Sequence, residues 1–307
     1  MRVVFMGTPD FAIPSLRALL NDEAFEVVAV VTQPDKPRGR SKKLTHCPTK
    51  EFALQEGLLV YCFDRIRNKE NVEILKSLKP DVMVTAAYGQ ILSQKVLDVP
   101  KLGCVNVHGS LLPKYRGAAP IQWAIVNGEK QTGITTMLTE RGLDCGNILL
   151  KEVVDIHESE TAGELFDRLA TLGGEILVKT LHGIKDSTIT PQKQNEDEAT
   201  HFPMLEKSDG QISWERSAQQ VHDLVRGVNP WPGAYTTYKD LTIKIWSSEV
   251  VEQKGECGEV LSSKDELIIA CKDGAIKVLE MQIPGKKRMA TDVVLRGFDI
   301  EVKDKFN

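Results

Sequence analysis

An alternation of strand-like and helix-like segments through the first half of the sequence most constrains what this chain can fold into. Short apolar runs predict strands at Arg2–Met6, Glu26–Thr32, Asp81–Ala86 and Val105–His108. The segments between them have the spacing of helices, at Asp10–Leu20, Lys50–Glu56 and Asn71–Leu78. This order indicates βαβ units, and therefore an α/β domain with a doubly wound, mostly parallel sheet of the Rossmann-like type.

The second half of the sequence has a different pattern. Thr161 followed by Glu164 predicts a capping box at the start of a long helix. The polar stretch Thr188–Gly210 is typical of an exposed connector. Short alternating strands follow, with a hairpin signal at Asp273-Gly274, and indicate a small β-barrel of the OB-like, Greek-key type. We therefore expect an α/β domain over residues 1–189, a linker over 190–208 and a β-barrel domain over 209–307.

The composition is that of a soluble globular protein, with 41% apolar and 27% charged residues in a chain of 307. A net charge of −4 excludes a uniformly basic nucleic-acid binder but allows a local basic patch. The longest apolar runs, such as Val27–Val31, are far too short to span a bilayer, and no signal-peptide pattern follows Met1. Six scattered cysteines without a CxxC pair favour reduced thiols in a cytoplasmic protein and argue against a metal site. No apolar face indicates an obligate partner, so we expect a monomer.

The first turn of the chain argues against a dinucleotide site. Gly7-Thr8-Pro9-Asp10 follows the first strand, where a dinucleotide-binding fold has its glycine-rich turn. The second and third glycines of that turn are absent, so the close backbone approach to a pyrophosphate is not provided. We expect a tight turn into a helix here, and no nicotinamide cofactor.

A polar pair, Asn106 and His108, ends an otherwise apolar strand. Residues two apart in a strand share a face, so both side chains should lie opposite Val105 and Val107. Sites in open parallel sheets form beyond the carboxyl ends of strands. An asparagine amide can donate to a developing oxyanion, and a histidine can give or accept a proton. The pair is a candidate catalytic site; the alternative is a hydrogen-bonded core pair.

A second candidate is Asp144, which lies between Gly142 and Gly146 in a segment that joins two strand-like runs. Flanking glycines suit a tight loop whose backbone can approach a ligand. A carboxylate in that loop can orient His108. The alternative, an aspartate that serves only its own turn, is equally compatible with the sequence.

Together these segments resemble the tetrahydrofolate-dependent formyltransferases. The resemblance rests on Asn106-x-His108, on Ser110-Leu111-Leu112-Pro113-Lys114-Tyr115-Arg116-Gly117 and on Gly142-Leu143-Asp144-x-Gly146. It extends from Gly7-Thr8-Pro9-Asp10-Phe11 through Asn229-Pro230-Trp231-Pro232-Gly233 to Pro284-Gly285-Lys286-Lys287, and is strongest with the members that act on methionyl-tRNA. Cys145 and Asn147 depart from the residues common in the family, which puts only the detail of that loop in doubt.

The resemblance implies that a formyl group is transferred from 10-formyltetrahydrofolate to the α-amino group of methionyl initiator tRNA, for translation initiation. It implies that Asn106, His108 and Asp144 are the catalytic residues. It implies folate contacts at Ser110, Leu111, Leu112 and Pro113, and at Tyr88, Gly89 and Gln90. Folate and tRNA are then the partners, and no metal is required.

A basic segment, Pro34–Leu44, follows the second predicted strand. It contains one acid and five cations, among which we expect tRNA contacts at Arg38, Arg40, Lys42 and Lys43. Glycine and two prolines argue against a helix, so we expect a flexible loop, which in the family enters the acceptor stem. The loop has no aromatic residue, which favours phosphate and groove contacts over base stacking. In the C-terminal domain the resemblance implies further tRNA contacts at Lys286 and Lys287.

Two other functions share parts of this pattern. A formyltransferase acting on an amino-sugar nucleotide would have the same three polar residues, but two phosphates do not require the basic segment. A nucleic-acid-binding module with a relic α/β domain would not need Asn106, His108 and Asp144 to be intact. Formylation assays with the two kinds of acceptor separate the three functions.

Overall fold

The structure is a computed structural model, and it describes residues 1–38 and 43–307. The chain divides into two compact units. The first unit comprises Met1–Gly117, Thr132–Val154 and Phe166–His201, and the second comprises Ala118–Gln131, Asp155–Leu165 and Phe202–Asn307. The predicted fold class is confirmed, because the first unit is built on a mostly parallel sheet and the second on a curled antiparallel sheet.

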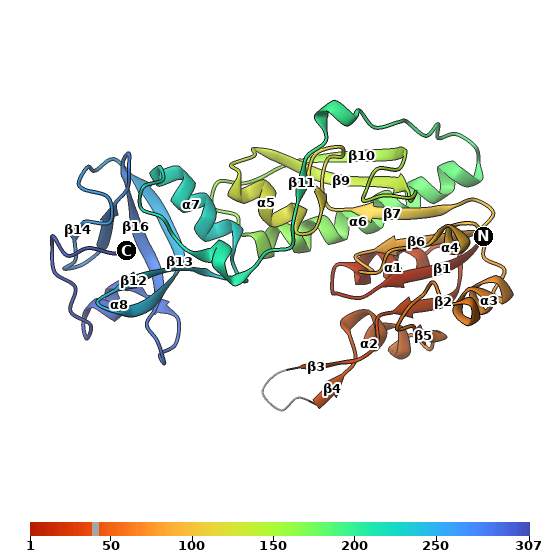
Figure 1. Cartoon of the computed structure of the whole chain (residues 1–307), viewed down its shortest axis with the longest axis horizontal. Coiled ribbons are helices and arrows are strands. Elements are labelled where there is room, and N and C mark those ends of the chain that lie inside the picture. Colours follow the sequence, from red (N-terminus) through yellow and green to blue (C-terminus); the bar gives the residue numbers. More distant parts are fainter. Residues whose placement is uncertain (39–42) are drawn as a thin grey trace. The chain divides into compact units, whose positions relative to one another are not determined.

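The first unit contains a seven-stranded sheet in the order β10-β9-β7-β6-β1-β2-β5 (Figure 1). Strands β5, β2, β1, β6 and β7 pair in parallel, whereas β9 is antiparallel to β7. The strands are β1 (Arg2–Gly7), β2 (Glu26–Thr32), β5 (Val60–Cys62), β6 (Val82–Ala86), β7 (Cys104–His108), β9 (Gln131–Leu138) and β10 (Ile148–Asp155). A short β8 (Arg116–Gly117) pairs with β11 (His201–Phe202).

Helices cover both faces of this sheet. They are α1 (Ala12–Leu20), α2 (Pro48–Gln55), α3 (Lys69–Ser77), α4 (Gln94–Leu97) and α6 (Ala162–Lys185), with a 3-10 turn at Glu196–Glu198. Gly173 of α6 brings that helix against β7, since a Cβ there would lie 3.0 Å from Cγ1 of Val107. On the opposite face, Cys104 belongs to a core cluster with residues of α3 and α4. Because side chains alternate along a strand, Asn106 and His108 share the face of Cys104.

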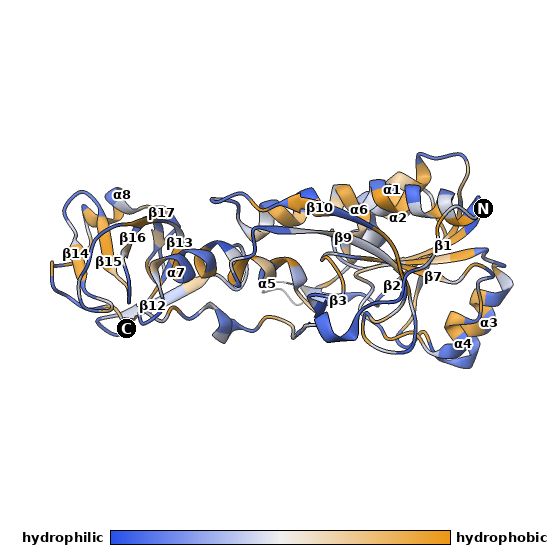
Figure 2. Cartoon of the chain, turned by 90° about the horizontal axis from the view of Figure 1, so that it is seen from above, coloured by the Kyte–Doolittle hydropathy of each residue, from blue (hydrophilic) through white to orange (hydrophobic). Residues whose placement is uncertain are grey.

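Local sequence explains where helices α1 and α6 begin. The predicted helix at Asp10 begins instead at Ala12, which leaves Pro14 in the first turn, where a missing N–H is tolerated. The capping box at the start of α6 is confirmed, because Thr161 and Glu164 exchange hydrogen bonds of 2.9 Å and 3.3 Å. Helix α6 carries both hydrophobic and hydrophilic residues along its length (Figure 2).

The segment Pro34–Leu44, predicted to be a flexible loop without a helix, contains paired strands that the sequence did not indicate. Strands β3 (Lys36–Arg38) and β4 (Lys43–Thr45) pair there as an antiparallel hairpin. Pro37 stands opposite Leu44 in this hairpin. A proline is tolerated in a two-stranded ribbon because one side of each strand has no partner strand.

The second unit has a six-stranded sheet in the order β12-β13-β16-β15-β14, with β17 paired to β16. Its elements are α5 (Pro120–Val126), a 3-10 turn (Lys207–Gly210), α7 (Ala218–Gly227), β12 (Ala234–Tyr238), β13 (Leu241–Val251), β14 (Val260–Ser262), β15 (Leu267–Ala270), β16 (Ala275–Gln282), β17 (Met289–Ala290) and α8 (Thr291–Leu295). Strand β13 has irregular register near Ser247, which bends the sheet around α7. The predicted hairpin at Asp273-Gly274 is confirmed, with Gly274 at a φ of 65° between β15 and β16. Strand β15 is hydrophobic throughout (Figure 2).

All six cysteines are free thiols, as predicted. Over residues 1–38 and 43–307, no helix combines the length and apolar character needed to cross a membrane. In the same part of the chain, no three His, Cys, Asp or Glu side chains are grouped as metal ligands.

Candidate active site

Asn106 is held so that one end of its amide stays available. It lies on β7, between Thr85 of β6 and Met137 of β9. The Thr85 hydroxyl donates a 2.8 Å hydrogen bond to Oδ1 of Asn106. Nδ2 makes no hydrogen bond to any described residue, so the half-buried side chain presents an N–H donor from the face of the sheet. Such a donor suits an oxyanion.

His108 has a fixed ring orientation and is only 6% exposed. Its Nε2 lies 2.9 Å from the carbonyl oxygen of Tyr115. A carbonyl can only accept, so Nε2 must carry hydrogen and donate. Nδ1 is left as the atom at which a proton is gained or given, and it lies 3.8 Å from Oδ2 of Asp144. The Tyr115 carbonyl therefore holds the ring, whereas the sequence indicated Asp144.

Asp144 is presented by a tight loop. Its backbone has a φ of 50°, and Oδ2 accepts a 2.8 Å hydrogen bond from the N–H of Gly117. Gly146 lets this loop fold back on β9, because a Cβ there would lie 1.7 Å from the carbonyl oxygen of Leu138. The structure thus brings Asp144 to His108, whose side chain shares a strand face with Asn106.

Gln194 holds the loop that carries Asp144 through the backbone of the loop. The sequence did not indicate this residue. Gln194 is 4% exposed, and its Nε2 donates to the carbonyl oxygens of Asp144 and Gly146, both at 2.8 Å. Its Oε1 accepts from Nε and Nη2 of Arg116 at 3.1 Å and 2.8 Å. Arg116 also pairs with Glu196, and its hydrogen bond keeps the pKa of that carboxyl below the ordinary value. A segment predicted to be a linker therefore supports the candidate site.

We expect Gln194→Leu to lower kcat about tenfold and the free energy of unfolding by about 1–3 kcal/mol. Both effects follow because two buried carbonyls and a guanidinium lose their shared partner. Gln192→Leu is the matched control, since that side chain is exposed two residues away. Thermal unfolding and steady-state kinetics check the expectation. A loss of stability with kcat unchanged in the folded protein would reduce Gln194 to a purely structural residue.

The predicted folate segment Ser110–Pro113 folds back over the face of β7. The Thr135 hydroxyl accepts from the N–H of Leu112 at 3.1 Å and donates to the carbonyl of Ser110 at 2.6 Å. The Ser110 hydroxyl donates to the Lys114 carbonyl at 2.7 Å and is fully buried. The hydroxyl is therefore engaged inside the loop, and the half-buried Leu111 and the backbone are what the loop offers to a ligand.

The second predicted folate segment, Tyr88–Gln90, follows β6. The Thr8 hydroxyl and the Gln33 amide donate to the carbonyl of Tyr88 at 2.9 Å and 3.1 Å. Gln33 also donates to the carbonyl of Gly89 at 3.0 Å, and Gln90 binds backbone groups of the β5–α3 connection. Burial raises the pKa of the Tyr88 phenol, so the ring is a neutral part of the core. Gly89 is the exposed member of the three.

A pocket of about 390 Å³ lies where β7 begins and β9 ends. Its lining residues are Gln94, Leu97, Gly103, Cys104, Leu138, Thr139, Glu140 and Arg141. Cys104 is two residues from Asn106, so the pocket begins about 7 Å from the candidate site. Burial raises the pKa of the Cys104 thiol to about 12, so this residue is uncharged, whereas Glu140 and Arg141 bring charged groups to the lining. None of the seven predicted folate residues lines the pocket, and no polar pattern in the sequence marks it.

The predicted tRNA contacts fall in both units. Arg38 and Lys43 pair through their backbones in the β3–β4 hairpin, whereas Arg40 and Lys42 lie outside the described residues. Lys286 and Lys287 are exposed in the turn between β16 and β17. Neither of these two lysines forms an ion pair with a described residue, so both charges are available to a partner.

Comparison with known proteins identifies the family. The family model described as formyl transferase matches residues 1–181, and the one described as formyl transferase, C-terminal domain, matches residues 204–299. The chain belongs to the formyltransferase family. This membership confirms the predicted resemblance and places the chain among the transferases.

Two relatives within this family are similar over nearly their whole length. Methionyl-tRNA formyltransferase of Caldanaerobacter subterraneus subsp. tengcongensis is 50% identical over 303 residues, covering 98% of each chain. The protein of the same name from Acetivibrio thermocellus is 51% identical over 304 residues, covering 98% of this chain and 97% of its own. Among solved structures, the sugar 3N-formyl transferase WlaRD, crystallised with dTDP and 5-N-formyl-THF, matches with a TM-score of 0.69 at 20% identity. It covers 94% of this chain and 99% of its own, which shows a shared fold.

Proposed function

We propose that this chain transfers a formyl group from 10-formyltetrahydrofolate to the α-amino group of methionyl initiator tRNA. The proposal rests above all on one observation: Nδ2 of Asn106 and Nδ1 of His108 share a strand face, with the Asp144 carboxylate 3.8 Å from that imidazole. Relatives about half identical to the chain are named for this reaction. The enzyme would act in the cytoplasm as a monomer.

The chemistry proposed for the three residues is acyl transfer between two nitrogens. The neutral methionyl amine attacks the formyl carbon, forms the new C–N bond and places negative charge on the formyl oxygen. Nδ2 of Asn106 and a protonated Nδ1 of His108 donate hydrogen bonds to that oxygen. When the carbon–nitrogen bond to the folate breaks, the leaving nitrogen takes a proton from His108. Asp144 accepts the proton that the attacking amine loses, either directly or through water.

The folate substrate is proposed to lie beside β7, between the pocket at Cys104 and the half-buried Asn106. The pocket beside Cys104 has the size expected for part of a small-molecule ligand, and its wall is uncharged at that residue. A ring seated there would place the formyl-bearing nitrogen toward Asn106, about 7 Å along the strand. The segments at 88–90 and 110–113 would then contact the remainder of the molecule at the carboxyl end of the sheet.

The tRNA is proposed to contact basic residues in each unit. In the first unit these are Arg38 and Lys43, which belong to β3 and β4, and Arg40 and Lys42, which lie outside the described residues. In the second unit, Lys286 and Lys287 lie near Trp246, whose ring has the Lys244 and Arg288 cations at 5.2 Å and 5.3 Å. Gln282 links Trp246 to the backbone of Lys286, because it accepts from the Trp246 indole and donates to the Lys286 carbonyl. Cations around an aromatic ring suit an RNA backbone.

An acceptor assay tests the proposal. The chain is incubated with 10-formyltetrahydrofolate and either methionyl initiator tRNA or an amino-sugar nucleotide, and the formylated product is measured. We expect formylmethionyl-tRNA and no formylated sugar. Formylation of the sugar alone would assign the chain to the other acceptor class, and no product with either acceptor would leave a binding module.

The basic hairpin gives a narrower prediction. Arg40→Ala should raise the KM for methionyl-tRNA about tenfold and reduce its dependence on salt, because one phosphate contact is lost. The KM for the folate should not change. Lys254→Ala is the control, since that lysine is exposed in the second unit and carries no assigned role. An unchanged KM for tRNA in Arg40→Ala would remove this residue from the interface.

A further inference from the structure

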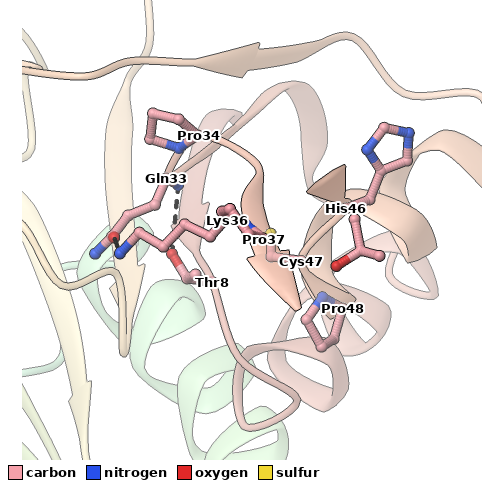
Figure 3. A pocket seen from close by; sticks show the side chains of 9 residues that line it. Thr8, Gln33, Pro34, Lys36, Pro37, His46, Cys47 and Pro48 are labelled. Atoms are coloured by element: carbon pink, nitrogen blue, oxygen red, sulfur yellow. Dashed lines mark hydrogen bonds between the residues drawn. The ribbon is translucent and has the colours of Figure 1, made fainter. Parts of the chain in front are cut away.

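A second pocket in the first unit is used by none of the steps above. It has a volume of about 170 Å³ and lies where β1 and β2 end and the β3–β4 hairpin begins (Figure 3). Its walls are Thr8, Gln33, Pro34, Lys36, Pro37, Thr45, His46, Cys47 and Pro48. The residues come from the turn after β1 and from the stretch between the end of β2 and the start of α2, so the hairpin forms one side of the pocket.

The register of the sheet places this pocket relative to His108. Gly7 pairs with Ala86 and Ala86 with Val107, so Thr8 is level with His108 two strands away. Adjacent strands are about 4.8 Å apart, which puts Thr8 about 10 Å from His108 across the sheet. Met6 pairs with Val31, so Gln33 lies one strand further on the same level. The pocket therefore lies about 10–14 Å from the imidazole along the carboxyl edge.

The lining combines flat apolar surfaces with polar side chains, among them Lys36. The rings of Pro34, Pro37 and Pro48 and the Cys47 thiol form the apolar part. The Lys36 ammonium donates to Oε1 of Gln33 at 2.8 Å and keeps two further donors.

His46 lies at the rim of the same pocket, and its ring points away from Gln33, Pro34 and Lys36 (Figure 3). Its Nδ1 lies 2.9 Å from Oδ2 of Asp35, and Lys50 donates to that same oxygen at 2.8 Å. The hydrogen bond from Lys50 keeps the pKa of Asp35 below its ordinary value, so the carboxylate accepts from Nδ1.

We propose that this pocket binds the terminal adenine of the aminoacyl-tRNA while the methionyl amine lies at Asn106 and His108. The inference rests on the proposed function and names the subsite for one part of its substrate. Adenine has a flat apolar face, ring nitrogens that accept and an exocyclic amine that donates. The flat face matches the proline rings, and an accepting ring nitrogen matches the Lys36 ammonium.

Covalent reach favours adenine over the methionine side chain. Extended chains advance about 1.2 Å per bond, so five bonds from the amine to the terminal methyl of methionine span about 6 Å. Seven bonds from the amine through the ester and ribose to the base span about 8 Å, and the ring extends further. Only the base reaches a pocket whose near wall is about 10 Å from His108.

The test uses adenosine 5′-monophosphate as the probe, with Thr45→Trp as a pocket-filling variant. Thr45 is exposed on β4 and lines the pocket, so a tryptophan there should fill it without disturbing the core. Leu44→Trp is the matched control, because Leu44 is exposed on the same strand and does not line the pocket. Lys36→Met is a second variant that keeps the length of the stem and removes the donor.

We expect the nucleotide to bind the wild-type chain, to raise the apparent KM for methionyl-tRNA and to leave the KM for folate unchanged. Binding should weaken tenfold or more in Thr45→Trp and in Lys36→Met, but not in Leu44→Trp. Cytidine 5′-monophosphate should bind at least tenfold more weakly than the adenine nucleotide. Equal binding of both nucleotides, or equal affinity in Thr45→Trp, would overturn the adenine assignment. Competition by methionine amide at this pocket would assign it to the amino-acid side chain instead.

The result of the nucleotide-binding test can be distinguished from the result of the formylation assay that tests the proposed function. Formylation of methionyl-tRNA by the wild-type chain is measured without any nucleotide, and it tests the reaction alone. If formylation occurs but the adenine nucleotide neither binds nor competes, the pocket assignment fails and the reaction stands.

Discussion

Asn106→Ala should lower kcat for formyl transfer by about 10²–10³-fold, the usual cost of removing one donor to an oxyanion. The KM values for both substrates should change little, because the donor acts most strongly once negative charge develops. The fold should persist, since the half-buried Asn106 receives only one side-chain hydrogen bond, from Thr85. Single-turnover rates with saturating folate and methionyl-tRNA measure the effect on the chemical step.

Thr85→Val shows whether the orientation of that amide matters. Valine has nearly the shape of threonine but cannot donate to Oδ1 of Asn106, so the amide loses the bond that turns Nδ2 outward. We expect a smaller fall in kcat, about tenfold, with thermal stability close to that of the wild type. If Asn106→Ala retained near-wild-type turnover while folded, the amide would not be part of the catalytic site.

The parts of the fold that could be predicted are those that local sequence determines. Strand β2 was predicted with its observed bounds, Glu26–Thr32, because a run of β-branched residues covered on both sides has few alternatives. The capping box at Thr161 and the turn at Asp273-Gly274 follow from side chains three residues apart or adjacent. The β3–β4 hairpin was missed because prolines and charges mask its short strands.

In the candidate site, too, only the residues that local sequence determines could be predicted. Asn106 and His108 are two residues apart, so the strand period alone places them on one face. The approach of Asp144 depends on a loop that follows another strand, and the Gly-x-Asp-x-Gly pattern indicated only that the loop is tight. Gln194 lies 50 residues from Asp144, and no local pattern links a buried amide to a distant carbonyl. The pocket beside Cys104 likewise combines segments that only the sheet order brings together.

Asp144→Asn should lower kcat by about 10³–10⁴-fold, as expected when a carboxylate that faces a catalytic imidazole loses its charge. The amide is nearly isosteric, and its oxygen can still accept the 2.8 Å hydrogen bond from the N–H of Gly117. The bonds from Gln194 go to backbone carbonyls of the loop and do not depend on the side chain. The loop should therefore stay in place, and the loss should report on the charge at 3.8 Å from His108.

Asp144→Ala separates the contribution of the Asp144 charge from that of its hydrogen bond with Gly117. Alanine removes both the charge and the acceptor for Gly117, so we expect a similar fall in kcat with an added loss of about 1 kcal/mol in the free energy of unfolding. Thermal unfolding of both variants and the wild type measures the loss in the free energy of unfolding. Rates at saturating substrates measure the fall in kcat. If Asp144→Asn were as active as the wild type while Asp144→Ala was impaired, the carboxylate would serve its loop alone. The proton taken from the attacking amine would then need a different acceptor.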